Sequence, residues 1–258
     1  MPTIEEIKEF WEKRAEELET GCTATLRETP LRELEIRAIL KYLTDGVRII
    51  DIGCGNGFST IEFAKNVKSD FLGIDYSEKM IFYAKEALKL QDAGALKGVV
   101  QFEIGDVLKL QEPEVPFDIA ITERCLQNLP TWDLQQKAII RIASVLRSGG
   151  LLIMTEGSLT GVNRLNRLRS MIGKPELEGA IPWHNKFFED QALVRDPVIN
   201  QAYDFIKIDH FCSTYMLMTR LVGPKYADFA KKLPNIGTFG YIKTYLWQKK
   251  KEGSRGKA

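Results

Sequence analysis

The sequence predicts an α/β protein built on a doubly wound, mostly parallel sheet with helices on both faces. Three observations indicate this fold class. Strand-like apolar runs alternate along the chain with segments of helical periodicity. The runs are continuously apolar, as expected of strands that helices cover on both faces. The first run, residues 47–52, leads into three glycines at alternate positions, and a helical pattern follows at once.

The composition excludes several classes of protein. The 258 residues fit one large domain or a domain with a cap, and 44% hydrophobic residues can fill a core. A net charge of +1 predicts no nucleic-acid partner. No run of 18 apolar residues occurs, so no membrane span is expected. The start of the chain lacks the pattern of a signal peptide. The cysteines are far apart and none forms a C-x-x-C pair: Cys22, Cys54, Cys125 and Cys212. We therefore predict no metal site and a cytoplasmic location.

Two helices are expected before the first strand. Thr3 and Glu6 form a capping box, and apolar residues then recur at helical spacing to residue 18. A second helix follows Pro30 and ends near residue 43. Both helices could simply pack on the sheet. Alternatively, the first helix is a lid and the loop 23–27 is a wall of a ligand site. Trp11 and Arg27 could serve either role.

Acidic residues stand at or just after the ends of the expected strands. These strands cover residues 47–52, 70–75, 98–104, 117–122 and 151–155, with helices at 58–67, after Ser77, and at about 132–147. In such sheets ligands bind beyond the carboxyl ends of the strands, so one edge should gather the acids. They are Asp51, Asp75, Asp106 and Glu123.

The glycine spacing indicates the charge of the ligand. Gly53, Gly55 and Gly57 do not follow the G-x-G-x-x-G spacing of dinucleotide-binding proteins. Asp51 before the turn would repel a pyrophosphate and suits a ligand with a cationic amine. Each acid could instead only cap a turn or a helix, as Ser77 beside Asp75 illustrates.

The segment from Asp51 to Gly57 resembles the first motif of class I, Rossmann-like methyltransferases, which use S-adenosylmethionine (SAM). Residues 117–120 resemble the fourth motif. Residues 146–153 resemble the Leu-(Lys/Arg)-Pro-Gly-Gly turn before strand five, with Ser148 where proline is usual. The resemblance covers about residues 45–156 and runs more weakly to the C-terminus.

The resemblance implies a SAM site. Asp75, which follows Asp51 by 75 − 51 = 24 residues, would accept from the ribose hydroxyls, and Asp106 from the adenine amino group. The family also implies a sheet of seven strands with a reversed last strand. The expected cofactor-binding residues are Asp51, Gly53, Cys54, Gly55, Asn56, Gly57, Asp75, Tyr76, Met80, Gly105, Asp106, Val107 and Glu123.

Five segments are expected along the chain. They are an N-terminal helical cap (1–44), a SAM-binding core (45–156), an insertion over the substrate (157–188), the C-terminal half of the same domain (189–248) and a flexible tail (249–258). Beyond the fifth strand we expect a basic amphipathic helix at 163–169, a loop at 179–186, a helix at 189–194, a strand at 205–212, a helix at 215–221 and a last strand at 239–247.

The insertion predicts the substrate class. Arg164, Trp183 and Asn185 are expected to bind the acceptor, because guanidinium groups suit phosphate or carboxylate and aromatic rings suit a sugar face. The pattern looks similar to methyltransferases of bacterial polysaccharide and sugar-nucleotide pathways. The arginines could instead form only a solvated helix face.

A hydroxyl acceptor needs a base, for which His184 and His210 are the candidates. His210 could instead be a core histidine. Glu123 and Glu156, just past strands four and five, are further candidates.

The predicted function is SAM-dependent O-methylation of a small sugar or sugar-nucleotide-like molecule. An N- or C-methyltransferase and a non-catalytic SAM-binding protein remain as alternatives. An NAD-dependent oxidoreductase is a third alternative, which the glycine spacing and Asp51 disfavour. The sequence leaves the acceptor, the methylated atom and the oligomeric state open.

Overall fold

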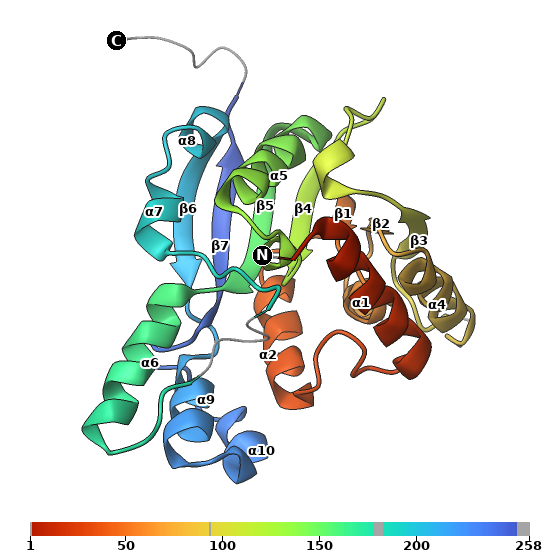
Figure 1. Ribbon diagram of the computed structural model, residues 1–258. Coiled ribbons are helices and arrows are strands. Elements are labelled where there is room, and N and C mark those ends of the chain that lie inside the picture. Colours follow the sequence, from red (N-terminus) through yellow and green to blue (C-terminus); the bar gives the residue numbers. More distant parts are fainter. Residues whose placement is uncertain (1, 93, 178–182, 252–258) are drawn as a thin grey trace.

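The computed structural model describes residues 2–92, 94–177 and 183–251, and a mixed sheet forms its centre (Figure 1). Its strands are β1 (Arg48–Ile52), β2 (Asp70–Asp75), β3 (Val99–Ile104), β4 (Phe117–Glu123), β5 (Leu146–Gly157), β6 (Tyr203–Asp209) and β7 (Ile242–Lys249). The seven strands lie in the order β3-β2-β1-β4-β5-β7-β6, and β7 runs antiparallel to both of its neighbours. The predicted fold class and the reversed last strand are thereby confirmed.

Helices surround this sheet. They are α1 (Ile4–Leu18), α2 (Thr29–Leu40), α3 (Phe58–Asn66), α4 (Glu78–Lys89), α5 (Trp132–Val145), α6 (Leu159–Met171), α7 (Asp190–Val194), α8 (Ile199–Ala202), α9 (Ser213–Leu217) and α10 (Ala227–Ala230), with short turns η1 (Val107–Lys109), η2 (Leu126–Asn128), η3 (Met218–Val222) and η4 (Pro224–Tyr226). In the part of the chain that the structure describes, no helix is long and apolar enough to span a bilayer.

Some boundaries differ from the expected ones. The helix expected to reach residue 147 ends at Val145, because Leu146 already pairs with Phe117 of β4. The last strand begins at Ile242 rather than residue 239. The helix expected at 215–221 is α9 followed by a π-helical turn, η3. These shifts arise where tertiary pairing decides the boundary rather than local pattern.

The continuous apolar runs are explained by two cores, one on each face of the sheet. Ile49 of β1 packs on the face covered by α2, α3 and α4. Its neighbour Ile50 packs on the opposite face, with α5. Successive side chains of a strand point to opposite faces, so both must be apolar. Each such aliphatic side chain contributes about 1.5–3 kcal/mol on burial.

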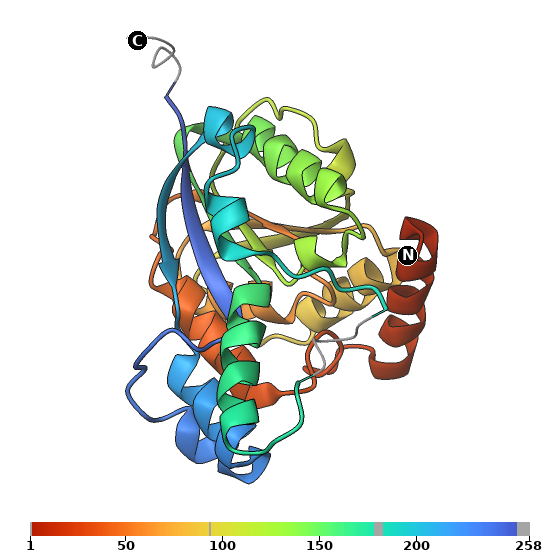
Figure 2. The same ribbon diagram turned by 60° about the vertical axis from the view of Figure 1, so that its left-hand side comes forward.

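A third core holds the C-terminal helices at one end of the carboxyl edge of the sheet. Leu165 of α6, Tyr215 of α9 and Ala230 of α10 pack there with Leu31 of α2. Figure 2 shows these helices on one side of the molecule and α1 on the other. The carboxyl edge of the sheet therefore carries two separate groups of helices: α1 on one side, and α6, α9 and α10 on the other. Helix α2 adjoins both groups.

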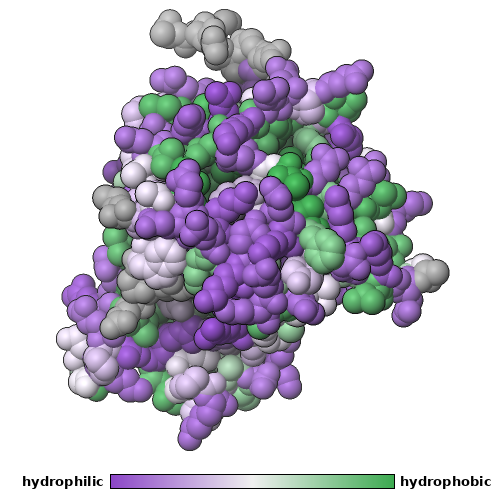
Figure 3. Space-filling view, turned by 45° about the vertical axis from the view of Figure 1, so that its right-hand side comes forward, coloured by the Kyte–Doolittle hydropathy of each residue, from purple (hydrophilic) through white to green (hydrophobic). Residues whose placement is uncertain are grey.

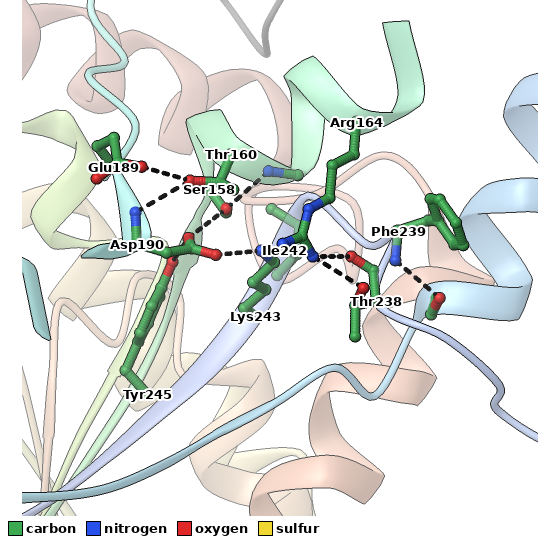
Figure 4. A network of polar contacts seen from close by, with 12 residues as sticks. Ser158, Thr160, Arg164, Glu189, Asp190, Thr238, Phe239, Ile242, Lys243 and Tyr245 are labelled. Carbon is green, nitrogen blue, oxygen red and sulfur yellow. Dashed lines mark hydrogen bonds and ion pairs between the residues drawn. The ribbon is translucent and has the colours of Figure 1, made fainter. Parts of the chain in front are cut away.

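A buried polar network joins the segment after β5 to β7 (Figure 4). Asp190 accepts hydrogen bonds from Ser158 Oγ at 2.6 Å and Tyr245 OH at 2.8 Å. Lys243 Nζ lies 2.5 Å from the other carboxylate oxygen of Asp190, and the lysine side chain is fully buried. The lysine holds the pKa of Asp190 below its usual range even though burial raises it. The network thus fixes where α6 and α7 leave the sheet.

Candidate functional site

A cavity of about 500 Å³ lies at the carboxyl ends of β1, β2, β3 and β4. That volume is typical of a small-molecule site. Helix α1 and the loop before α2 cover it. Its lining comprises Ile4, Ile7, Phe10, Trp11, Arg14, Thr25, Leu26, Arg27, Ile52, Gly53, Gly55, Asp75, Tyr76, Met80, Gly105, Asp106, Val107, Leu108, Glu123, Arg124, Cys125, Gln127, Asn128, Leu129 and Asn185.

The glycine turn after β1 forms one wall of this cavity. Gly53 and Gly55 have φ angles of 76° and 57°, a region that side chains disfavour. A Cβ on Gly53 would lie 2.4 Å from Cys125 Sγ, and one on Gly55 would lie 2.6 Å from Thr25 Cγ2. Gly57, at the start of α3, instead faces Phe102 of the core at 2.5 Å. Two glycines therefore shape the cavity, and the third permits core packing.

Asp75 at the end of β2 faces the cavity and is tied to two turns. One carboxylate oxygen accepts from Gly55 N at 3.0 Å, and the other accepts from Ser77 N at 2.9 Å. Burial raises the pKa of Asp75 to about 6, against the effect of these hydrogen bonds. The carboxylate is therefore oriented before any ligand arrives.

Asp51 and Glu123 add further negative charge around the same turn. Asp51 is buried in β1 behind the cavity wall and accepts from Thr60 Oγ1 at 2.5 Å. Burial, together with the charges of Glu123 and Asp75, raises the pKa of Asp51 to about 7. Three carboxylates thus repel one another at the ends of adjacent strands β2, β1 and β4. A cation bound between them would relieve that repulsion.

The far end of the cavity is formed after β3. Gly105, Asp106 and Val107 line it, and one oxygen of Asp106 accepts from Leu108 N at 2.9 Å. Tyr76 and Met80 lie on the same wall. Because the strands lie in this order, the parts of the cavity wall follow one another in a row: the end of β3, the end of β2 with Asp75, the end of β1 with the glycines, and the end of β4.

Glu156 positions the loop after β4 without lining the cavity. Its oxygens accept from the backbone N–H groups of Cys125, Leu126 and Gln127 at 3.0–3.2 Å, and from Thr122 Oγ1 at 2.9 Å. Burial raises its pKa to about 7. Because these bonds satisfy the carboxylate, its role is to hold the loop that forms the wall beside β4.

Helix α1 is the roof of the cavity. Both carboxylate oxygens of Glu12 accept from the first N–H groups of α4, at 2.9 and 3.3 Å. Arg14 donates to the carbonyls of Thr23 and Ala24. The face of the molecule that carries α1 is mostly hydrophilic (Figure 3), whereas Ile7, Phe10 and Trp11 line the cavity below it. The amphipathic helix therefore separates the cavity from water.

Several expected cofactor residues lie behind the cavity rather than on its wall. Asp51 and Gly57 are described above. Asn56 donates to the carbonyls of Glu19 and Gly21 and so anchors the loop after α1. The thiol of Cys54 is buried, which raises its pKa. The structure places the remaining expected cofactor residues on the wall: Gly53, Gly55, Asp75, Tyr76, Met80, Gly105, Asp106, Val107 and Glu123.

The two histidines lie off the cavity wall. His184 is 2% exposed and packs against Phe10, Trp11 and Trp183, with ring centroids 4.4–5.9 Å apart. Neither ring nitrogen forms a hydrogen bond, and burial lowers the pKa of His184 to about 4. His210 follows β6, and its backbone carbonyl accepts from Asn235 Nδ2. In this arrangement His184 braces the roof helix.

The expected substrate residues are dispersed. Arg164 donates to Thr238 on the side of α6 (Figure 4). Trp183 is 43% exposed and packs edge-on against Phe10. Asn185 alone among these three lies on the cavity wall. Residues 179–182 of the expected substrate loop lie outside the described residues.

Other wall residues were not expected from the sequence. Arg14 lies on the first helix, for which a lid was one of two alternatives, but Arg14 itself was not assigned to a ligand. The segment after Glu123 was not assigned to a ligand either. A signal for the second was present, since Arg124, Cys125, Gln127 and Asn128 directly follow a strand end. The loop 23–27, for which a wall was one of two alternatives, contributes Thr25, Leu26 and Arg27 to the lining.

In the described part of the chain, no group of three or more metal-binding side chains is placed to hold an ion.

Residues 43–193, more than half of the chain, match the family model of the methyltransferase domain. An uncharacterized methyltransferase of Schizosaccharomyces pombe is 30% identical over 124 residues, 47% of this chain and 44% of that protein. The 27-O-demethylrifamycin SV methyltransferase of Amycolatopsis mediterranei is 33% identical over 133 residues, 51% of this chain and 46% of that protein. The chain thus spans less than half the length of these curated relatives.

Magnesium protoporphyrin IX methyltransferase from Synechocystis, solved with bound SAH, superposes with a TM-score of 0.62. The match covers 95% of this chain and 99% of that one at 15% identity, which shows a shared fold. The family match includes the strands that form the cavity, and by this match the chain belongs to the methyltransferase domain family.

Proposed function

We propose that this protein is a SAM-dependent methyltransferase that acts on a small molecule. The observation that carries the proposal is the set of three carboxylates, Asp51, Asp75 and Glu123, around a glycine turn that side chains cannot enter. SAM carries an ammonium and a sulfonium and, when bound, supplies an activated methyl group. The same carboxylates would repel the pyrophosphate of NAD, which argues against an NAD-dependent oxidoreductase.

The order of the strands supports an extended pose for SAM. We assign adenine to the end of β3 beside Asp106, ribose to Asp75, and the methionine portion to Gly53 and Gly55. Each oxygen of Asp75 accepts one backbone hydrogen bond and keeps a further lone pair for a ribose hydroxyl. The reacting end then lies toward β4, next to the loop that Glu156 holds. Alignment of donor and acceptor there would supply much of the catalysis.

The roof indicates an acceptor with an apolar body. Ile7, Phe10 and Trp11 cover the cavity, and rings of this kind favour a flat apolar molecule. The names of relatives that modify rifamycin, demethylmenaquinone and a porphyrin are consistent with this class. A sugar acceptor has less support, since Arg164 and Trp183 lie off the wall. Cytoplasmic location remains a prediction from the sequence.

Calorimetric titration with SAM and SAH tests the proposal. We expect saturable binding of both at pH 8. Asp75→Asn should weaken binding about 10- to 100-fold, the equivalent of the 1.5–3 kcal/mol of hydrogen bonds to a charged group. Asp70→Asn, at the exposed start of the same strand, is the control and should bind normally. Absence of SAM binding would refute the function, and binding without turnover on any acceptor would favour a non-catalytic SAM-binding protein.

A further inference from the structure

Two guanidinium groups and two carboxylates are enclosed at the end of β4. Arg32 and Glu35 of α2 are 2% and 0% exposed. Arg124 Nη2 lies 3.1 Å from Glu123 Oε1, and Arg124 Nη1 lies 3.5 Å from Glu35 Oε2. Ser59 Oγ donates to the same Glu123 oxygen at 3.2 Å. Of the four charged residues, Glu123 and Arg124 reach the cavity wall.

Part of the hydrogen-bonding capacity of this pair is unused. Glu123 Oε2 and Arg124 Nε are buried and form no hydrogen bond, and each such group carries a desolvation cost. Arg124 also has φ of 55°, a strained conformation for a residue with a side chain. Its N–H donates to Thr155 O and its carbonyl accepts from Asn128 Nδ2, both at 2.8 Å, so the strain is maintained by its surroundings. Maintained strain in a residue that lines the cavity, with unpaired polar atoms buried beside it, points to a polar group of a ligand.

The pair lies next to the reacting end of the cavity. β4 is the neighbour of β1 in the sheet, and Cys125 packs directly on Gly53 of the glycine turn. The adenine end of the cavity, at β3, lies on the other side of β1 and is two strands beyond it. A group held by Glu123 and Arg124 is therefore close to the methyl group of SAM in the pose assigned above, on which this inference rests.

We propose that Glu123 and Arg124 form the acceptor subsite and that the acceptor is a ring compound whose reacting group is a hydroxyl. Oε2 of Glu123 accepts the hydroxyl proton as the O–H bond breaks. The freed electron pair of the oxygen forms the new bond to the methyl carbon. The carbon–sulfur bond breaks, and its electron pair returns to sulfur, which becomes a neutral thioether. The guanidinium of Arg124 stabilises the negative charge that develops on the oxygen.

The charge balance favours oxygen over nitrogen. Four ionisable groups face Glu123: Arg124, Arg32 and Glu35 in the cluster, and Asp51 from the side of the glycine turn. Burial raises the pKa of Glu35 well above its usual range, so this carboxyl is neutral near pH 7. With Glu35 neutral, the acidic side chain of this cluster that remains beside the guanidinium groups of Arg32 and Arg124 is Glu123. An amine, which gains positive charge as it is methylated, is disfavoured there, and a hydroxyl that loses its proton is favoured.

Transfer of labelled methyl from SAM to three matched bicyclic probes tests this inference: naphthol, naphthylamine, and a nitronaphthol that is already ionised at neutral pH. Wild-type protein should methylate naphthol in preference to naphthylamine. Glu123→Gln should weaken SAM binding by no more than about tenfold, because Asp51 and Asp75 remain. It should lose about 100- to 10,000-fold in kcat with naphthol, the range for a lost general base. With nitronaphthol the loss should shrink at least tenfold, because no proton must be removed. Glu62→Gln, on the outer side of α3, is the control with unchanged rates.

Each other outcome overturns the assignment. An equal loss with both naphthols would give Glu123 a structural role. Weakened SAM binding with unchanged kcat would assign Glu123 to the ammonium of the cofactor. A preference for naphthylamine, or no transfer to either naphthol by protein that binds SAM, would refute the hydroxyl acceptor. Failure of the proposed function is separate, since it appears as absent SAM binding in the wild type.

Discussion

At the scale of single residues, two glycines with the same backbone conformation have different surroundings. Gly46 and Gly53 have φ of 75° and 76°. Nothing lies within 4 Å of a Cβ on Gly46, whereas a Cβ on Gly53 meets Cys125 Sγ at 2.4 Å. The pair therefore separates the cost of the backbone conformation from the cost of lost space.

We expect Gly46→Ala to lower stability by about 1–2 kcal/mol, the cost of a left-handed residue with a Cβ, and to leave SAM binding unchanged. Gly53→Ala should show a similar backbone cost and also lose SAM binding at least about tenfold, because Cys125, which lines the cavity, must shift. Denaturant unfolding and calorimetry measure the two effects. Equal binding by both variants would remove Gly53 from the ligand wall.

The carboxylates around the turn predict a pH dependence of binding. Asp51 and Asp75 have pKa values raised to about 7 and 6, mainly by burial. A bound cation favours their ionised forms and lowers both values, so binding between pH 6 and 7 should release protons. SAM affinity should be greatest above pH 7 and fall as pH decreases through these values. Calorimetry in buffers of different ionisation enthalpy counts the protons, and proton uptake on binding would contradict the prediction.

Residue roles could be predicted from the sequence where they depend on a strand end. Asp75 and Asp106 follow apolar runs, and parallel strands bring such positions to one edge. The role of His184 could not be predicted, since its environment is made by Phe10 and Trp11, which are more than 170 residues earlier in the chain. Arg124 and the loop after it also follow a strand end, so their place on the cavity wall could have been predicted in the same way as that of Asp75.

At the scale of elements, the segment after β5 depends on one buried ion pair. Asp190, at the start of α7, meets Lys243 of β7, Ser158 before α6, and Tyr245. The pair joins elements about 50 residues apart in sequence. Removing one partner would leave an uncompensated charge in the interior.

We therefore expect Asp190→Ala to destabilise the protein by about 3–5 kcal/mol, the usual effect of breaking a buried ion pair. The second change Lys243→Met should recover a large part of that loss, because it removes the unpaired ammonium. Chemical denaturation of the two single variants and the double variant measures the coupling. A double variant as unstable as the sum of the two singles would show that Asp190 and Lys243 do not act as a pair.

Element boundaries were predictable where the local pattern decides them. The start of α1 at its capping box agrees with the sequence, since Thr3 and Glu6 satisfy each other's backbone groups. The end of α5 and the start of β7 were not predictable, because pairing across the sheet sets them. The short helices α8 and α10 have too few residues for a periodic pattern.

At the scale of the whole molecule, Glu35 links stability to pH. It is fully buried, and burial raises its pKa from 4.5 to about 8. The folded state then holds a proton that the unfolded state has lost. The stability associated with the neutral form is fully present below pH 4.5, decreases as pH rises toward 8, and is lost above it.

Glu35→Gln should flatten this part of the pH profile, because glutamine does not titrate. The slope for the wild type should exceed that of the variant by up to about 1.4 kcal/mol per pH unit. Glu33→Gln, on the same helix but 46% exposed, is the matched control and should follow the wild type. Urea unfolding between pH 5 and 8 gives the slopes, and parallel profiles for wild type and Glu35→Gln would refute the assignment.

The position of β7 has a consequence for synthesis on the ribosome. Of the seven strands this one is made last, yet it lies between β5 and β6, and among the described residues β6 pairs with β7 alone. A nascent chain that ends before Ile242 can complete the five parallel strands, but its β6 has no neighbour to pair with and Asp190 has no lysine. Loss of β7 would therefore leave β6 as an unpaired strand that cellular proteases can attack.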